Sequence, residues 1–377
     1  MLSLKNLIIL GICPITALAI SCNSGSSTKT TADSVVAVTD STSTSSPTAI
    51  KPMGPSPSWG ESIHPEMLAV IEKLESYKAA PIETLSATDA RKNPTPTTAV
   101  MDLMKEHHIP MPAPKVDTMG VDIPVSGGSI HARVYTPKEG NTPFPVIVYY
   151  HGGGWVIADN DTYNASAQGL AEQVGAVVVS VEYRKGPEFK FPTAHNDAFA
   201  AYEYVLKNAG TMKGDTAKIA VVGESAGGNL AANVSIMARD KHIKQPLYEV
   251  LVYPVANNDM NSPSYQKYAS AKPLNKPMMG WFTEKYLPNM AASADPRIAL
   301  VKANLKGLPP TTIINAEIDP LANDGEKLTD ALKAAGVKVN HKEYKGVTHE
   351  FFGMATIVPE AKDAEALAAS DLKDAFK

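Results

Sequence analysis

Short β-rich apolar runs alternate with helical stretches along most of this chain, and that alternation limits the fold more than any other feature. The predicted strands are Ile130–Thr136, Val146–Tyr150, Ala176–Val181, Lys218–Val222, Glu249–Tyr253, Thr311–Asn315 and Lys338–Tyr344. The predicted helices include Ala194–Asn208, Gly227–Arg239, Gly325–Ala335 and Pro359–Phe376. Apolar strands that alternate with helices of roughly ten residues or more are typical of a mostly parallel sheet covered on both faces. The sequence therefore predicts an α/β fold.

The first residues differ from this pattern. An apolar run from Leu7 to Ile20, broken by Pro14, is shorter than the roughly 20 residues that a spanning helix needs, so residues 1–21 are predicted to be a signal peptide. The stretch that ends at Cys22, Ala19-Ile20-Ser21-Cys22, resembles a bacterial lipoprotein processing box, in which the cysteine becomes the lipidated first residue. The alternative is a plain secretory signal in which Cys22 has no role.

A tether is predicted for residues 22–58. Residues 23–58 contain 17 Ser and Thr, four Pro and no aromatic residue, too little apolar surface to offset the entropy of ordering. From Trp59 the composition changes, and a helical pattern follows Pro65, so residues 59–377 are expected to be the folded domain. Asn23 is not acidic, and by the lipoprotein resemblance it would permit passage to the outer membrane, with the domain in the periplasm or at the surface of a bacterial envelope.

Composition excludes several classes of protein. The chain has 35 Lys and Arg against 39 Asp and Glu, a net charge of −4, which is not the basic balance that nucleic-acid binding requires. The only cysteines are Cys13 and Cys22, so no disulfide, catalytic thiol or cysteine metal site is possible after them. Neither a His-Glu-x-x-His motif nor another ligand cluster occurs, and no metal or organic cofactor is expected.

One Gly-x-Ser-x-Gly motif carries the strongest chemical signal. Ser225 lies between Gly223 and Gly227, and it joins a β-branched strand to a helix. A serine on such a sharp turn is exposed for attack, and glycines remove side chains that would collide with the strand and helix. The motif predicts a nucleophile elbow, and the alternative is a loop without function.

A second motif, His151-Gly152-Gly153-Gly154-Trp155, directly follows a predicted strand. Glycines leave backbone N–H groups bare and let the main chain approach a developing oxyanion to about 3 Å. The alternatives are a flexible turn or a phosphate cradle. Neither dinucleotide-binding nor P-loop glycine spacing occurs, which disfavours the phosphate cradle.

A serine nucleophile needs a base and an orienting acid. His349 is the best-placed histidine, because it lies in a short loop after the last predicted strand, whereas His151 is expected to brace the glycine run. Asp319 follows the strand Thr311–Asn315, with Glu317 as a competitor one period-2 step earlier. The order Ser225, Asp319, His349 is the order found in α/β hydrolases.

These motifs together resemble the bacterial hormone-sensitive-lipase-like family of esterases, which share an HGGG loop, a G-D/E-S-A-G-G elbow, a D-P-L acid motif and a late His-x-Phe. The resemblance covers about residues 63–352. It implies the α/β-hydrolase fold, with a helical cap formed by about residues 61–112 and 257–287. It also implies functional residues: the triad Ser225, Asp319 and His349, and oxyanion N–H groups from Gly153, Gly154 and Ala226.

Two positions depart from the family pattern: Lys185-Gly186 replaces apolar residues, and Glu350 replaces a small residue after His349. Glu350 could raise the basicity of His349 or compete with Asp319 for it. The predicted function is a lipid-anchored serine carboxylesterase for small esters with short-to-medium acyl groups. The alternatives are an acetyl esterase for acetylated polysaccharide and an inactive hydrolase fold kept as a binding module.

Overall fold

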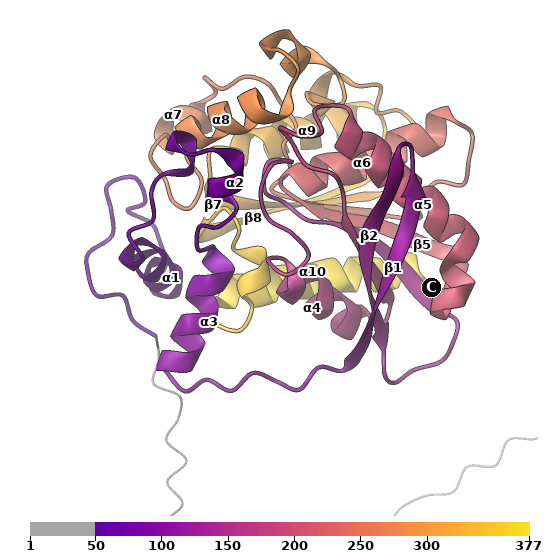
Figure 1. Ribbon diagram of the computed structural model, residues 1–377, viewed down its shortest axis with the longest axis horizontal. Helices are drawn as coiled ribbons and strands as arrows, with labels where there is room; N and C mark the ends of the chain where they lie inside the picture. Colours follow the sequence, from indigo (N-terminus) through magenta and orange to yellow (C-terminus); the bar gives the residue numbers. More distant parts are fainter. Residues whose placement is uncertain (1–49) are drawn as a thin grey trace, which may run out of the picture. The chain divides into compact units, whose positions relative to one another are not determined.

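A sheet of eight strands in the order β1-β2-β4-β3-β5-β6-β7-β8 organises the computed structural model, which describes residues 50–377. The strands are β1 (Val116–Val125), β2 (Gly128–Pro137), β3 (Phe144–Tyr150), β4 (Val177–Glu182), β5 (Gly214–Glu224), β6 (Glu249–Val252), β7 (Thr311–Ile318) and β8 (Val339–Thr348). The pairs β1·β2 and β2·β4 are antiparallel, and the other neighbouring pairs are parallel. The predicted mostly parallel sheet is confirmed, with β1 and β2 at one edge (Figure 1).

Helices cover both faces of the sheet. They are α1 (Pro65–Ser76), α2 (Ala87–Ala90), α3 (Pro96–Glu106), α4 (Asn164–Val174), α5 (Thr193–Asn208), α6 (Ala226–Asp240), α7 (Pro263–Lys267), α8 (Lys276–Tyr286), α9 (Ala322–Ala334) and α10 (Pro359–Ala375). In β3, Val146 and Val148 join the core formed with α5, α6 and α9, while Ile147 and Tyr149 join the core formed with α1, α3, α4 and α10. The strand alternates its side chains, as a strand buried on both faces must.

Each strand and helix predicted from the pattern is present. The prediction missed β1 and α4. Most side chains of β1 are exposed, and its only neighbour in the sheet is β2, so no apolar alternation marks it. In α4, Gly169 interrupts the helical pattern. A Cβ there would lie 3.0 Å from a carboxylate oxygen of Glu365 on α10, a tight contact with the end of a side chain.

The chain contacts the domain before Trp59. Ile50 is buried, and the N–H groups of Met53 and Gly54 donate to the carboxylate of Glu72 on α1 at 2.6 and 2.7 Å. Ile50, Met53 and Gly54 therefore contact the domain, although the predicted tether extends to residue 58. The predicted signal peptide and Cys22 lie outside the described residues. Within residues 50–377, no helix has the length and apolar character to cross a membrane.

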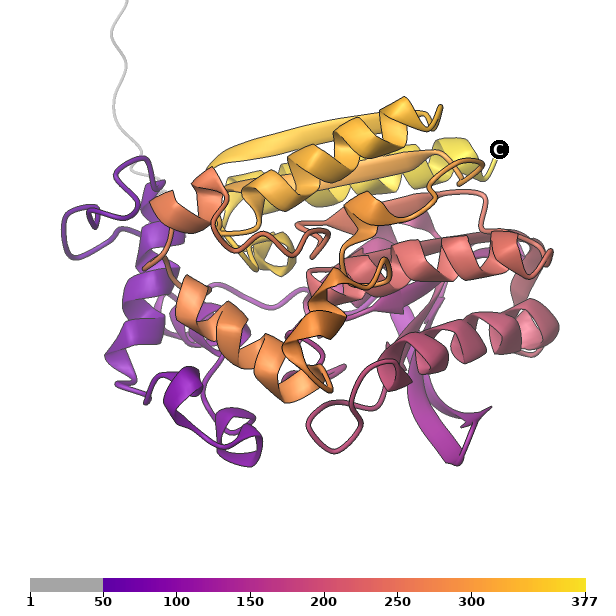
Figure 2. The same cartoon turned by 90° about the horizontal axis from the view of Figure 1, so that it is seen from above.

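Two segments distant in sequence meet near one end of the sheet (Figure 1, Figure 2). The first contains α1, α2, α3 and a 3₁₀ turn, η1 (Ile82–Thr84), and the second contains α7 and α8. Trp281 of α8 donates its indole N–H to the carbonyl oxygen of Leu85 at 3.2 Å, and α8 also contacts η1. These are the segments that the family resemblance assigns to a cap.

Candidate active site

Ser225 occupies the sharp turn from β5 into α6. Its backbone has φ +56° and ψ −117°, a conformation that residues with a side chain rarely adopt. A Cβ on Gly223 would lie 2.1 Å from the carbonyl oxygen of Gly227, and a Cβ on Gly227 would lie 2.0 Å from that of Tyr150. Only glycine fits at either flank, so the sequence Gly-x-Ser-x-Gly and the strained serine belong to the same local structure.

The structure brings the three predicted triad residues together. His349, which follows β8, has its Nε2 3.0 Å from Oγ of Ser225 and its Nδ1 2.6 Å from Oδ2 of Asp319. The other oxygen of Asp319 accepts the N–H of Leu321 at 2.8 Å, which fixes the carboxylate. The exposed fractions are 5% for Ser225, 2% for His349 and 0% for Asp319, so these bonds are shielded from water. An imidazole held this way can accept the serine proton at Nε2 while Asp319 holds the N–H at Nδ1.

The surroundings of His349 favour its charged form. Burial lowers its pKa, but the negative charge of Asp319 and the hydrogen bond to it raise the pKa more, with smaller contributions from Glu350 and Glu224. The pKa of His349 therefore lies above its ordinary value of 6.5. A base of raised pKa is better able to take a proton from serine, provided that it is neutral at the start.

The two other acidic residues considered from the sequence have different partners. Glu317 lies within β7, which is the condition for it to compete with Asp319. Its carboxylate instead accepts the N–H of Gly346 at 2.9 Å. Glu350 has φ +69°, and one of its oxygens accepts the hydroxyl of Tyr163 at 2.7 Å. Among the described hydrogen bonds, Asp319 is the one carboxylate on the imidazole of His349.

The glycine run lies across the carboxyl end of β3. Gly153 and Gly154 have φ +95° and +59°, and the carbonyl of Gly153 accepts the N–H groups of Val156 and Ile157 at 3.0 and 2.9 Å. Among the backbone hydrogen bonds of turns, loops and helix caps within residues 50–377, none has the N–H group of Gly153, Gly154 or Ala226 as its donor. Ala226 is also the first residue of α6, where the helix dipole favours negative charge. These three donors are free to bind an oxyanion.

His151 lies behind the glycine run, as the sequence suggests. It is fully buried, its Nδ1 is 2.8 Å from the carbonyl oxygen of Gly152, and its ring stacks on Tyr183 with centroids 4.4 Å apart. The Tyr183 hydroxyl donates to the carbonyl oxygen of His151 at 2.9 Å. His151 and Tyr183 thus hold the start of the glycine run in place.

Two cations that the sequence did not identify as functional hold the segment after the glycine run. The ammonium of Lys185 donates to the carbonyl oxygen of Ala158 at 2.6 Å and pairs with Glu182 at 2.5 Å. The guanidinium of Arg91 donates to the carbonyl oxygen of Val156 at 2.8 Å. In the sequence, Lys185 was identified only as a departure from the family pattern. No sequence pattern pointed to Arg91, because the carbonyl of Val156 that it binds is 65 positions away.

Glu224 supports the elbow from its other side. Its carboxyl group accepts the hydroxyl of Tyr149 at 2.5 Å and that of Tyr253 as well. Burial raises the pKa of Glu224, while the hydrogen bonds lower it in part. The ring of Tyr253 also lies 4.4 Å from that of His349. This arrangement fixes the backbone before Ser225 and packs an aromatic wall beside the imidazole.

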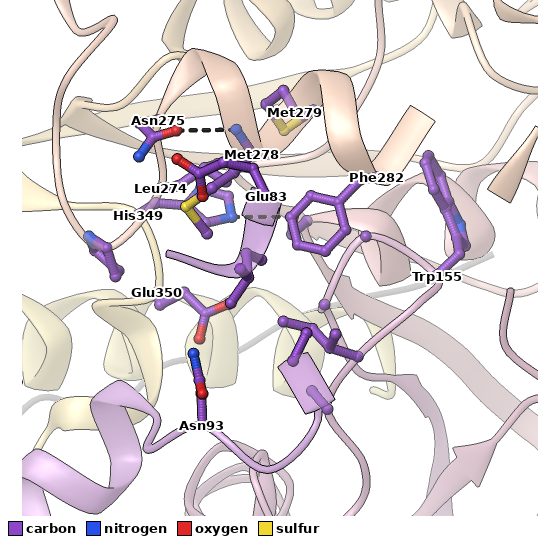
Figure 3. A pocket seen from close by; sticks show the side chains of 18 of the residues that line it. Glu83, Asn93, Trp155, Leu274, Asn275, Met278, Met279, Phe282, His349 and Glu350 are labelled. Carbon is purple, nitrogen blue, oxygen red and sulfur yellow. Dashed lines mark hydrogen bonds between the residues drawn. The ribbon is translucent and has the colours of Figure 1, made fainter. Parts of the chain in front are cut away.

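A cavity of about 460 Å³ opens above Ser225 and His349. Its wall includes apolar side chains from the loop after β3 and from the second cap segment: Ile157, Leu274, Met278, Met279 and Phe282. Figure 3 shows Met278, Met279 and Phe282 of α8 around the cavity, together with His349 and two carboxylates, Glu83 and Glu350. Residues 50–377 contain no group of three or more His, Cys, Asp or Glu arranged to hold a metal ion.

Comparison with known proteins identifies the family. A model of a family described as having the alpha/beta hydrolase fold matches residues 147–353, more than half of the chain. The chain belongs to the α/β hydrolase family. Its motifs place it in the hormone-sensitive-lipase-like group, so the predicted family and the predicted fold are confirmed.

Two relatives in this α/β hydrolase family are named as ester hydrolases. Carboxylesterase NlhH of Mycobacterium tuberculosis is 37% identical over 259 residues, which cover 68% of this chain and 79% of that protein. Ethyl acetate hydrolase of Pseudomonas putida is 30% identical over 315 residues, which cover 80% and 96%. Both alignments extend over most of the folded part of this chain.

Solved structures agree. An esterase of Pyrobaculum calidifontis superposes with a TM-score of 0.72 at 36% identity, covering 81% of this chain and 98% of that one. A thermostable esterase from Pseudomonas putida superposes with a TM-score of 0.77 at 31% identity, covering 85% and 99%. The likeness to these α/β hydrolases therefore includes nearly the whole of each solved chain.

Proposed function

We propose that this α/β hydrolase is a serine carboxylesterase that cleaves small esters with short-to-medium acyl groups through an acyl-enzyme. One observation carries the proposal: the hydrogen-bonded chain Ser225–His349–Asp319 lies at a cavity beside three free backbone N–H groups. The esterases among its relatives support the same reaction class. The cavity volume of about 460 Å³ suits a small ester.

In the proposed mechanism, each step belongs to particular atoms. Oγ of Ser225 attacks the ester carbonyl as Nε2 of His349 takes its proton, and Asp319 stabilises the imidazolium through Nδ1. The N–H groups of Gly153, Gly154 and Ala226 bind the oxyanion. Collapse of the tetrahedral intermediate breaks the bond to the alcohol, which leaves with the proton from His349. Water then attacks the acyl-enzyme with His349 again as the base, which releases the carboxylic acid and regenerates Ser225.

The experiment is a panel of 4-nitrophenyl esters from acetate to dodecanoate, with acetylated xylan alongside, assayed on wild type and Ser225→Ala. We expect a maximum at short-to-medium chains and a loss on the order of 10⁴-fold or more in Ser225→Ala. Ser293→Ala, another serine that lines the cavity, is the matched control and should keep its activity. A fluorophosphonate should label the wild type on Ser225.

Other outcomes decide among the alternatives. A marked preference for acetylated xylan over every small ester would make the protein a polysaccharide acetyl esterase. Absence of both hydrolysis and fluorophosphonate labelling in folded protein would leave a binding module. More than a tenth of wild-type activity in Ser225→Ala would refute the assignment of the nucleophile.

We also infer that Cys22 anchors the enzyme to a membrane of the bacterial envelope through lipid, with the outer membrane as the expected location. The support is the sequence that precedes Cys22 and the Ser/Thr-rich segment that follows it. Cys22→Ser should move the protein from the membrane fraction to the soluble fraction or leave it unprocessed, with esterase activity retained. Cys13→Ser, inside the predicted signal peptide, is the control. A wild-type protein that is soluble with an unmodified N-terminus other than Cys22 would replace lipidation with simple secretion.

A further inference from the structure

Two acidic side chains of the active-site cavity have no cationic partner among the described ion pairs. Glu83 is in η1 of the first cap segment, and Glu350 follows His349. Both line the cavity, and Figure 3 shows them in it together with His349. One carboxylate oxygen of Glu83 is buried and accepts no hydrogen bond within residues 50–377. A buried carboxylate oxygen without a donor is costly, unless a ligand supplies what the protein does not.

Glu350 lines the cavity, and a hydrogen bond fixes its carboxylate. Its backbone lies in the left-handed region, φ +69°, and one of its oxygens accepts the Tyr163 hydroxyl at 2.7 Å. Tyr163 is a neutral donor that is itself buried, so it orients the carboxylate without neutralising it. The charge of Glu350 is therefore fixed one residue from the catalytic imidazole.

Most cations of the cavity wall are already paired. Arg91 binds Glu188 at 2.7 Å, Lys185 binds Glu182 at 2.5 Å, and Lys272 binds Glu75 at 3.0 Å. The remaining wall lysine, Lys78, is exposed to solvent, where screening weakens its field. A third wall acid, Asp159, is also exposed and accepts the N–H and hydroxyl of Thr162. The interior is left with the unpaired charges of Glu83 and Glu350.

The rest of the wall strengthens their effect. Met278, Met279 and Phe282 make the cavity apolar near the carboxylates, and an apolar surround lowers the local dielectric. A ligand that complements such a site is an amphipathic cation, with an apolar body for the methionines and a positive charge for the glutamates. Resting on the proposed esterase function, we propose that the enzyme selects esters that carry a positive charge, and that Glu83 and Glu350 determine this specificity.

A pair of acetate esters with the same shape and different charge tests the proposal. The probes are acetylcholine and its neutral isostere 3,3-dimethylbutyl acetate, and the quantity is the ratio of their kcat/KM values. We expect wild type to favour acetylcholine by about ten-fold or more, the effect of one charge pair at an effective dielectric near that of a protein surface. Glu83→Gln and Glu350→Gln should each reduce the ratio, and the double variant should bring it close to one. Each ratio compares two substrates on one variant, so a general loss of activity cancels.

Glu75→Gln/Lys272→Gln is the matched control, because Glu75 and Lys272 line the same cavity as an ion pair and their joint removal leaves the net charge of the wall unchanged. Its ratio should stay at the wild-type value. Hydrolysis of 4-nitrophenyl acetate separates this inference from the proposed function. If wild type cleaves no ester, the proposed function fails. If it cleaves 4-nitrophenyl acetate but favours the neutral isostere, the charge preference is overturned. A preference for acetylcholine that survives the double variant would remove Glu83 and Glu350 as its cause.

Discussion

An alanine scan of the glycine run tests the oxyanion loop most directly, because the structure predicts different results at adjacent positions. At Gly153, φ is +95° and an added Cβ would lie 2.3 Å from the carbonyl oxygen of Ile157, inside the loop itself. At Gly154, φ is +59° and the added Cβ would lie 2.3 Å from the ring of Phe282, a cap side chain. The first collision can be relieved only by moving the loop backbone, and the second by moving or removing one side chain.

The expected magnitudes follow from these contacts. A residue with a Cβ in the left-handed region costs roughly 1–2 kcal/mol, which both substitutions share. Displacing one oxyanion donor costs roughly 2.7–4 kcal/mol, or about 10²–10³ in kcat. Gly153→Ala should show this loss in kcat with little change in KM. Gly154→Ala should show a similar loss that is largely recovered in Gly154→Ala/Phe282→Ala, and Gly154→Val should be worse because its side chain is branched.

The assay is kcat and KM for 4-nitrophenyl butyrate, together with the affinity for a trifluoromethyl ketone, which mimics the tetrahedral adduct. Phe282→Ala alone supplies the background for the double variant, and thermal unfolding verifies that each variant is folded. The affinity for the ketone should fall in parallel with kcat. Folded Gly153→Ala with a wild-type kcat would show that this loop does not bind the oxyanion. Failure of Phe282→Ala to rescue Gly154→Ala would refute the origin assigned to that loss.

Three further predictions concern the groups around the glycine run and the triad. Asp319→Asn should lower kcat by orders of magnitude, because the amide favours the wrong imidazole tautomer, while Glu317→Gln should lower kcat only slightly. Steady-state kinetics that show the reverse order would assign the orientation of His349 to Glu317. Lys185→Met should lower kcat roughly ten-fold with KM nearly unchanged, and Lys185→Arg should restore part of the loss; equal loss in both variants would point to packing instead. Because the pKa of His349 is raised above 6.5 and catalysis needs its neutral form, kcat/KM should fall as the pH decreases through a midpoint above 6.5. Glu350→Gln should move that midpoint down, and an unmoved pH profile would remove the charge of Glu350 from the environment of the imidazole.

The sequence was sufficient for the parallel part of the sheet, because those strands are buried on both faces and their apolar runs are continuous. The edge strand β1 was not predictable in this way, since it is held by its backbone pairing with β2 and most of its side chains face solvent. Helix α4 was missed for a different reason. Gly169 weakens its helical pattern, and the glycine lies against a carboxylate on α10, a contact between segments almost 200 positions apart that a local pattern does not show.

In the site, too, the residues that could be predicted are those whose role depends on neighbouring positions in the sequence. Ser225 was predictable because its strained turn requires glycine two positions before it and two positions after it, and this spacing is visible in the sequence. Arg91 was not, because it acts on the carbonyl of Val156, which any residue would offer.

Glu350 lies between these cases. Its position beside His349 was plain, but adjacency alone left two roles open, a rival of Asp319 or a charge near the imidazole. Glu350 has a left-handed backbone and its carboxylate accepts the Tyr163 hydroxyl, while Asp319 accepts the Nδ1–H of His349. The added carboxylate is thus part of the cavity wall and acts on the imidazole through its charge, while the hydrogen bond to the imidazole belongs to Asp319. We therefore expect this departure from the family to affect which esters the enzyme accepts, and we expect the chemistry of ester cleavage to depend on the three residues that the motifs identify.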